Sequence, residues 1–215
     1  MGRHREFDVE EALAAAQRVF WLKGYDGTSI SDLTEAMGIN SPSLYAAFGS
    51  KQGLFTAVLD HYDSSREKVL ARILAEPTAK DVATRYLSTL ADYATDKKHP
   101  PGCLLIKAGL SPGEGEIAKQ LARHKAATEM ALRERFECAK RSGDLPRDAD
   151  PTALMRYLLA VGSGLCVQAA TGASRDDLRT IADLALAGFP LAEKPKQVKP
   201  EKKKAAARKS ASAAV

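Results

Sequence analysis

The sequence has few aromatic residues and no long uninterrupted apolar run. Phe, Trp and Tyr together make up 6% of the 215 residues. No apolar stretch approaches the roughly 18–20 residues that a membrane-spanning helix needs, and the polar segment 1–8 lacks the apolar core of a secretory signal. The remaining composition, 45% hydrophobic and 27% charged, suits one compact unit or a small domain fused to a larger one. We therefore expect a cytoplasmic protein.

Cysteine is also scarce. The three cysteines, Cys103, Cys138 and Cys166, lie far apart and form no Cys-x-x-Cys pair. An odd number at this spacing indicates neither a disulfide framework nor a structural zinc knuckle. We expect free thiols and no bound metal.

Motifs of the common enzyme classes are missing as well. The sequence contains no Gly-x-Gly-x-x-Gly after a strand, no Walker loop, no His-Glu-x-x-His and no Gly-x-Ser-x-Gly. Ser65 and Lys68 have the spacing of one nucleophile motif, but its partner motifs are missing and both residues fall within a long amphipathic segment. The sequence thus predicts no catalytic residues, no cofactor and a protein that is not an enzyme.

What the sequence does have is helical periodicity. Apolar residues recur at three- and four-residue intervals almost throughout, and strand-like alternation is hard to find. An all-α protein of about nine helices is therefore expected. Capping residues, glycines and prolines place these helices at 8–24, 29–38, 41–49, 50–73, 81–97, a short one from 103, 116–141, one from 150 and one from 174.

The second and third helices are short and are joined by a turn at residues 38–40. Ser41, followed by a proline, is expected to cap the third helix, as Ser29 caps the second and Ser50 the fourth. Two short helices supported by a longer one form a helix-turn-helix, in which the second short helix is presented rather than buried.

The start of the third helix carries groups that suit nucleic acid. Ser41, Pro42 and Ser43 are small, so the helix end can approach a base-pair edge, and Asn40 adds a hydrogen-bonding side chain. Unpaired N–H groups at the helix starts suit phosphate oxygens. Because the first 51 residues carry five Lys and Arg against seven Asp and Glu, local geometry has to contribute more than net charge.

A dense pattern covers the chain from about Phe7 to Phe55. Its parts are Ala16 and Phe20 in the first helix, the Gly24-Tyr25 turn, Gly27-Thr28-Ser29-Ile30, Met37-Gly38-Ile39 and the run from Ser43 to Lys51. This pattern resembles the DNA-binding domain of the tetracycline-repressor (TetR) family of bacterial transcriptional regulators. The resemblance implies a helix-turn-helix domain at 1–51, a larger helical domain at 52–191 and a tail at 192–215.

The resemblance also implies two sets of DNA contacts and a small core. Phosphates would be contacted by Thr28, Tyr45 and Lys51, and bases or the groove wall would be met by Ser41, Pro42 and Ser43. The core would consist of Phe20, Ile30, Leu33, Ile39, Leu44 and Phe48. Ala46 and Ala47 are smaller than the side chains of some members, so readout would lean on backbone positioning and DNA shape.

Both ends of the chain are basic. Residues 3–5 form a short arm that could reach a minor groove or remain solvated. Of the 32 Lys and Arg and 27 Asp and Glu residues, eight basic and one acidic residue lie in 194–215, which leaves 24 and 26 elsewhere. The tail has too few apolar groups to offset the entropy of ordering, so we expect disorder. Its two open interpretations are salt-dependent DNA affinity and a solubilising terminus.

For the larger domain, the resemblance implies effector binding and dimerisation through the last two helices. Residues that fit the dimer are Leu154, Leu158, Val161, Leu165, Leu178, Ile181 and Leu184, with Gly162 and Gly164 allowing close helix approach; packing within one chain is the alternative for each. A dimer would place two recognition helices roughly 34–36 Å apart and favour a near-palindromic operator in double-stranded DNA.

The effector in this interpretation is an unknown small molecule. Candidate pocket residues are His61, Tyr62, Tyr86, Tyr93, Cys103, His124 and Met155, although such residues at helical spacing are also typical of plain core. Effector binding would move the fourth helix and spoil the spacing of the recognition helices, so that a repressor is released.

Two alternatives stay open. The Gly-Cys-Leu segment at 102–104 resembles one found in family members that sense electrophiles, oxidants or metal ions. If Cys103 heads a short helix, the positive helix end lowers its thiol pKa, which would make a thiol- or metal-responsive regulator. His99 could join Cys103, but two ligands are too few for a metal site. An architectural DNA-binding protein driven by the tail is the second alternative.

Overall fold

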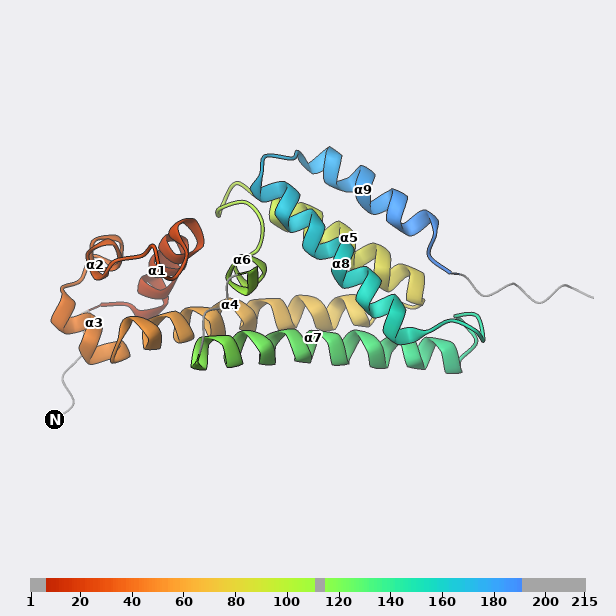
Figure 1. Ribbon diagram of the computed structural model, residues 1–215, viewed down its shortest axis with the longest axis horizontal. Helices are drawn as coiled ribbons and strands as arrows, with labels where there is room; N and C mark the ends of the chain where they lie inside the picture. Colours follow the sequence, from red (N-terminus) through yellow and green to blue (C-terminus); the bar gives the residue numbers. More distant parts are fainter. Residues whose placement is uncertain (1–6, 111–114, 191–215) are drawn as a thin grey trace, which may run out of the picture.

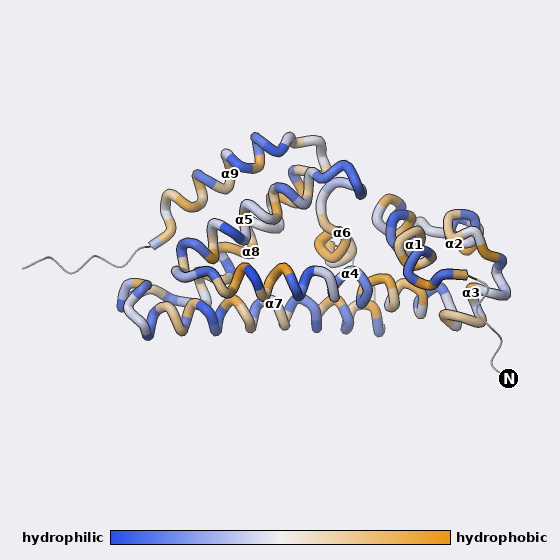
Figure 2. Tube along the Cα trace, turned by 180° about the vertical axis from the view of Figure 1, so that it is seen from behind, coloured by the Kyte–Doolittle hydropathy of each residue, from blue (hydrophilic) through white to orange (hydrophobic). Residues whose placement is uncertain are grey.

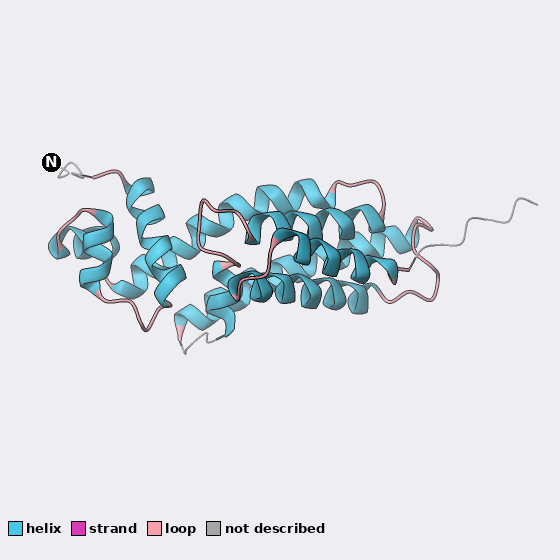
Figure 3. Ribbon diagram, turned by 90° about the horizontal axis from the view of Figure 1, so that it is seen from above, coloured by secondary structure: helices cyan, strands magenta, loops and turns pink. Residues whose placement is uncertain are grey.

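The structure is a computed structural model that describes residues 7–110 and 115–190. Within these residues the chain forms nine α-helices and no strand, which confirms the predicted all-α class (Figures 1 and 3). The helices are α1 (Val9–Lys23), α2 (Ile30–Met37), α3 (Ser41–Phe48), α4 (Lys51–Leu74), α5 (Ala79–Ala94), α6 (Leu104–Leu110), α7 (Glu116–Arg141), α8 (Pro151–Ala170) and α9 (Arg175–Ala187).

The expected arm at 3–5, residues 111–114 and the expected tail at 192–215 lie outside the described residues.

Side-chain caps fix the short helices of the helix-turn-helix. Ser29 caps α2 as predicted, with its hydroxyl accepting the Asp32 N–H at 3.1 Å and the Asp32 carboxylate accepting the Ser29 N–H at 2.9 Å. The prediction that Ser41 caps α3 is wrong. Asn40 is the cap, because its Oδ1 reaches the N–H of Ser43 at 2.8 Å, and Ser41 is instead the first residue of the helix.

The predicted start of α5 is also wrong, by two residues. Thr78 caps the helix, accepting the N–H of Asp81 at 3.1 Å, and its hydroxyl donates to the Asp81 carboxylate at 2.6 Å. Asp81 therefore belongs to the first turn instead of beginning the helix. The helix ends at Ala94, three residues before the predicted Lys97.

The helices form an elongated molecule with the helix-turn-helix at one end (Figure 1). We call α1–α3 the helix-turn-helix unit and α5–α9 the larger domain; α4 starts in the former and runs into the latter. α7 lies beside α4 in the same direction, since Gln120 contacts Thr56 near one end and Arg135 contacts Leu74 near the other. α5 and α8 lie above this pair, and α9 is outermost (Figures 1 and 2).

A small core holds the helix-turn-helix unit together. Phe20, Leu33 and Leu44 are fully buried, as predicted. The other three predicted core residues, Ile30, Ile39 and Phe48, are partly buried and pack against the same cluster. This core orients α3 against α1 and the first turns of α4.

The larger domain contains one helix of unexpected apolarity. α8 is long and apolar enough, by length and composition alone, to cross a membrane, with a mean hydropathy of 1.4. The sequence prediction counted uninterrupted apolar runs, and Arg156 interrupts this one. Leu158 and Leu165 of α8 are buried in the core, so packing within the chain accounts for part of its composition and a single such helix is weak evidence for a membrane. α6, between the two parts, is also mostly hydrophobic (Figure 2).

Gly53 allows α3 and α4 to approach closely. A Cβ added at Gly53 would collide with the backbone oxygen of Phe48, so Gly53→Ala forces α3 and α4 apart. We expect a lower melting temperature, because the free energy of unfolding should fall by about 1–3 kcal/mol. The matched control is Gly109→Ala, also within a helix, where an added Cβ meets nothing within 4 Å. Equal melting of the two variants would contradict the close approach.

Candidate nucleic-acid interface and effector cavity

The recognition helix α3 is buried on one side and open on the other. Leu44 anchors it in the core, whereas Tyr45 next to it is 47% exposed. Pro42 is exposed, and Ser41 and Ser43 are partly exposed. The structure therefore places these four predicted DNA-contacting residues at or near the surface of one short helix.

The cap by Asn40 leaves the serines of α3 available. The side-chain oxygen of Asn40 is engaged by the N–H of Ser43. The hydroxyl groups of Ser41 and Ser43 make no hydrogen bond within the described part of the chain. Both hydroxyls can therefore donate to or accept from a base edge, and the capping amide holds the helix end in place.

Lys51 lies at the start of α4 and is positioned by an aromatic residue. Its Nζ is 4.5 Å from the ring centroid of Tyr25. Tyr25 in turn packs on Phe55, with ring centroids 5.1 Å apart, and on Phe20 at 6.2 Å. Burial, and secondarily Asp26, raises the pKa of Tyr25, which keeps its hydroxyl protonated. An ammonium beside a helix N-terminus suits a phosphate.

Thr28 occupies a different environment. It is only 2% exposed, and its hydroxyl donates to the carbonyl of Gly24 at 2.6 Å. The side chain thus holds the turn between α1 and α2. A phosphate contact through Thr28 stays a prediction, and the burial of its hydroxyl argues against it.

A cavity of about 580 Å³ lies between α4, α5 and α7. Five of the seven predicted pocket residues line it, namely His61, Tyr62, Tyr86, Tyr93 and His124. Ala14 and Gln17 of α1 also line it, so the helix-turn-helix unit forms part of the wall. Cys103 and Met155 do not: both are buried in the core, Cys103 behind Tyr62, whose hydroxyl donates to the Cys103 Sγ at 3.4 Å.

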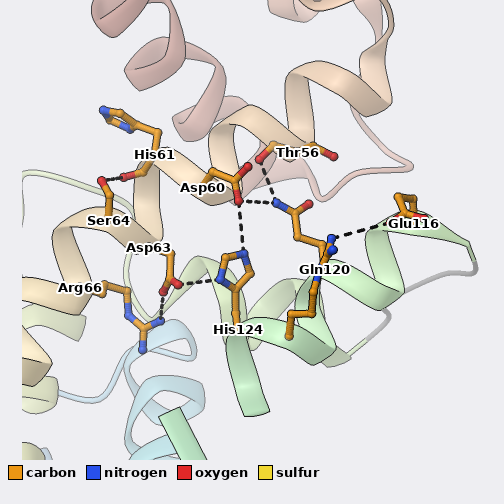
Figure 4. A network of polar contacts seen from close by, with 10 residues as sticks. Thr56, Asp60, His61, Asp63, Ser64, Arg66, Glu116, Gln120 and His124 are labelled. Atoms are coloured by element: carbon orange, nitrogen blue, oxygen red, sulfur yellow. Dashed lines mark hydrogen bonds and ion pairs between the residues drawn. The ribbon is translucent and has the colours of Figure 1, made fainter. Parts of the chain in front are cut away.

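A polar network joins α4 to α7 at this cavity (Figure 4). His124 Nδ1 lies 2.6 Å from Asp63 Oδ2, and Arg66 donates to Asp63 Oδ1 at 3.1 Å. On the other side, His124 Nε2 is 3.7 Å from Asp60, which also accepts from Gln120 at 2.7 Å. Of these residues the sequence pointed only to His124, because ion pairs between distant helices leave no periodic signal.

Cys103 stands directly before α6, as expected, and is 3% exposed. Its pKa is lowered, chiefly by a hydrogen bond with the thiol of Cys166, against the opposing effect of burial; Arg66, Tyr62 and the backbone at Ile106 also lower it. The pKa of Cys166 is raised by the same pairing. A neighbouring thiol, more than the helix end, thus favours the Cys103 thiolate.

His99, which the sequence offered as a second ligand beside Cys103, is engaged elsewhere. His99 stacks on Trp21 with ring centroids 4.9 Å apart, and its Nδ1 lies 2.9 Å from the Pro100 carbonyl. Among the described residues, no group of three or more His, Cys, Asp or Glu side chains could hold a metal ion.

Trp21 connects the helix-turn-helix unit to the cavity. This buried α1 side chain packs edge-on against Tyr62 at 5.4 Å and stacks with Tyr93 at 6.2 Å between ring centroids. Both tyrosines line the cavity. Sequence reasoning did not single out Trp21, although its being the one tryptophan of the chain was a signal.

Polar contacts reinforce the same junction. Lys107 of α6 donates to the carbonyls of Trp21 at 2.7 Å and Leu22 at 2.9 Å, which satisfies the C-terminal end of α1. Arg18 donates to the carbonyl of Lys98 at 2.7 Å. α1 is thus held by the larger domain at several points.

An exposed recognition helix on a three-helix unit, carried by a larger helical domain, defines a helix-turn-helix DNA-binding protein. Comparison with known proteins agrees: the family described as bacterial regulatory proteins, tetR family, matches residues 12–58. The chain is 38% identical to the HTH-type transcriptional repressor ComR of Escherichia coli K12 over 194 residues, covering 88% of this chain and 92% of ComR. It is 32% identical to the repressor BdcR of the same organism over 186 residues, covering 86% and 90%.

A solved structure gives the same result. A cysteine mutant of the TetR family regulator CifR, complexed with 26-bp operator DNA, superposes with a TM-score of 0.81 at 36% identity, covering 87% of this chain and 100% of that one. This chain therefore belongs to the TetR family of bacterial transcriptional regulators. It is a DNA-binding regulator and not an enzyme.

The positions of α3 and α4 lead to opposite expectations for two kinds of variant. Lys51→Ala and Tyr45→Phe should weaken binding about equally for all DNA sequences. Lys51→Ala should also reduce the slope of the logarithm of the binding constant against the logarithm of the salt concentration by about one. Ser41→Ala and Ser43→Ala should change sequence preference by about 1–3 kcal/mol per base pair. Fluorescence anisotropy with a set of duplexes separates the two, with the exposed Lys125→Ala as control. A reversed pattern would refute the assigned roles.

Proposed function

We propose that this chain is a homodimeric, cytoplasmic repressor that binds a near-palindromic operator and is released when a small molecule occupies the cavity between α4, α5 and α7. The carrying observation is that one cavity is lined both by α1 and by the larger domain. An occupant contacts the helix-turn-helix unit directly, so its presence biases the position of that unit. The proposal requires no cofactor.

Exposed apolar side chains on α8 and α9 support the dimer. Tyr157, Val167, Ile181 and Leu184 are all exposed, and Leu184 reaches 72%. Leu158, Leu165 and Leu178, which the sequence offered for the same interface, are buried within the chain. Gly162 packs against α5 of the same chain, since an added Cβ would lie 2.7 Å from the Leu90 side chain. Gly164 faces open space. A second copy of the chain would cover the remaining exposed apolar side chains of α8 and α9.

Coupling between cavity and DNA would pass through α1 and α4. α4 carries cavity residues along its middle and Lys51 at its start, and Trp21 contacts the wall residues Tyr62 and Tyr93. A molecule that displaces these rings shifts α1 relative to the larger domain, which changes the separation of the two recognition helices. By linkage, effector and operator then weaken each other equally.

Burial argues against the thiol-responsive alternative as the primary mode. Cys103 is covered by protein and its Sγ accepts a hydrogen bond from Tyr62, so an external electrophile has no direct path in this conformation. The architectural alternative is disfavoured by the helix-turn-helix unit, whose acidic residues outnumber its basic ones.

Selection of bound duplexes from a random pool tests the operator. We expect recovery of two inverted half-sites whose centres are about one helical turn apart, bound by two chains per duplex in sedimentation equilibrium. Leu184→Glu should convert the dimer into a monomer and reduce affinity for the full site, while Leu110→Glu, at another exposed leucine, should not. Recovery of single half-sites bound by a monomer would refute the dimer.

Trp21 supplies a test of the coupling. Because it is the one tryptophan, native emission reports on the junction alone. Saturation with operator DNA should change this emission, with the same midpoint as binding measured by anisotropy of the labelled duplex. A duplex of unrelated sequence at equal concentration is the control. Emission that stays constant while the operator binds would show that the junction does not respond.

A further inference from the structure

We propose that the cavity takes an amphipathic carboxylic acid, with the carboxylate at Arg66 and the apolar part along α4, α5 and α7. The inference rests on the proposed function only in treating this cavity as the effector site. It adds the chemical class of the molecule, which follows from the groups that the cavity presents.

Arg66 is the group that recognises the acid. It belongs to α4, lines the cavity, and its side chain is 28% exposed. One of its terminal nitrogens donates to Asp63 at 3.1 Å, and its guanidinium carbon lies 5.8 Å from the Tyr62 ring centroid. No other hydrogen bond of the guanidinium occurs in the described part of the chain. With five N–H donors, Arg66 keeps a free edge for a bidentate carboxylate.

The carboxylate of Asp63 does not satisfy this site by itself. Its two oxygens are shared between two basic side chains, Arg66 at 3.1 Å and His124 at 2.6 Å (Figure 4). Asp60 lies on the far side of His124 and its side chain is 63% exposed, so solvent screens it. Glu67, the other acidic lining residue, is exposed as well. A second, incoming carboxylate therefore meets an arginine that is only partly neutralised.

Two tyrosines of the lining also offer hydrogen-bond donors. Burial raises the pKa of Tyr93 to about 12 and raises that of Tyr86 further, so both phenols stay protonated. Neither hydroxyl donates a hydrogen bond to a described residue. The wall near Arg66 thus offers O–H and N–H donors, which suit a carboxylate, and the positive charge of Arg66 disfavours an ammonium group.

The other part of the cavity is apolar. The volume of the whole cavity lies in the range of sites that enclose small molecules. Hydrocarbon side chains from three helices form this wall: Leu70, Ile73, Leu74, Leu90, Ala127 and Ala131. An acid with an alkyl or ring body of moderate size would bury its apolar surface here and place its charged end at Arg66.

Three probes of equal chain length test the class: octanoate, 1-octanol and octylamine. Binding is measured by Trp21 emission and by release of operator DNA. We expect octanoate to bind at least about tenfold more tightly than the alcohol, as charge-assisted hydrogen bonds contribute, and the amine to bind more weakly than either. Octanol binding as tightly as octanoate, or no binding of octanoate at millimolar concentration, would overturn the proposal without any variant.

Arg66→Met should bring octanoate affinity down to that of octanol, and Arg66→Lys should retain part of the preference. Arg72→Met is the matched control, because Arg72 is an exposed residue of the same helix outside the cavity lining. If Arg66→Met is folded and still prefers octanoate, the assignment is wrong. If octanol releases the operator and octanoate does not, the acid class fails while the proposed function stands. If octanoate binds through Arg66 without releasing DNA, the class stands and the release mechanism fails.

Discussion

The structure depends on the insertion of Trp21 into the larger domain. This side chain belongs to the first helix of the helix-turn-helix unit, yet its neighbours Tyr62, Tyr93 and His99 come from α4, α5 and the loop after it. Burial of so large a ring contributes several kcal/mol to the junction. Without it, α4 would be the main covalent and packing link between the two parts.

The same rings give the cavity its position. Tyr62 and Tyr93 both contact Trp21 and line the cavity, and Ala14 and Gln17 of α1 line it as well. The helix-turn-helix unit lies at one end of the molecule, and α4 runs from it into the larger domain (Figure 1). A regulator built in this way needs no long chain of intermediaries between its two binding surfaces.

Much of the fold and part of the candidate site were predictable from the sequence, and the exceptions have physical causes. Helix starts were found at Ser29 and Ser174, each with an Asp three residues later, whereas the similar pair of Thr78 and Asp81 at the start of α5 was missed. The error at α3 arose because Asn40 and Ser41 are both good caps, and only the geometry of the turn decides between them. Five of the cavity residues, His61, Tyr62, Tyr86, Tyr93 and His124, were among the seven candidates that the sequence offered. Arg66 and Asp63 were not, because their meaning depends on the neighbour that packing across helices supplies.

The close approach of α8 to α5 at Gly162 brings α8 into contact with a residue that lines the cavity. A Cβ at this glycine would lie 3.0 Å from the ring of Tyr86, which also lines the cavity. In the proposed dimer α8 also faces the mate. A ligand that displaces Tyr86 in one protomer would therefore move α8, which lies at the dimer interface. Occupancy of the first cavity would then change the affinity of the second. Effector binding would then depart from a hyperbolic curve as the effector concentration rises, because the missing Cβ of Gly162 lets α8 contact Tyr86.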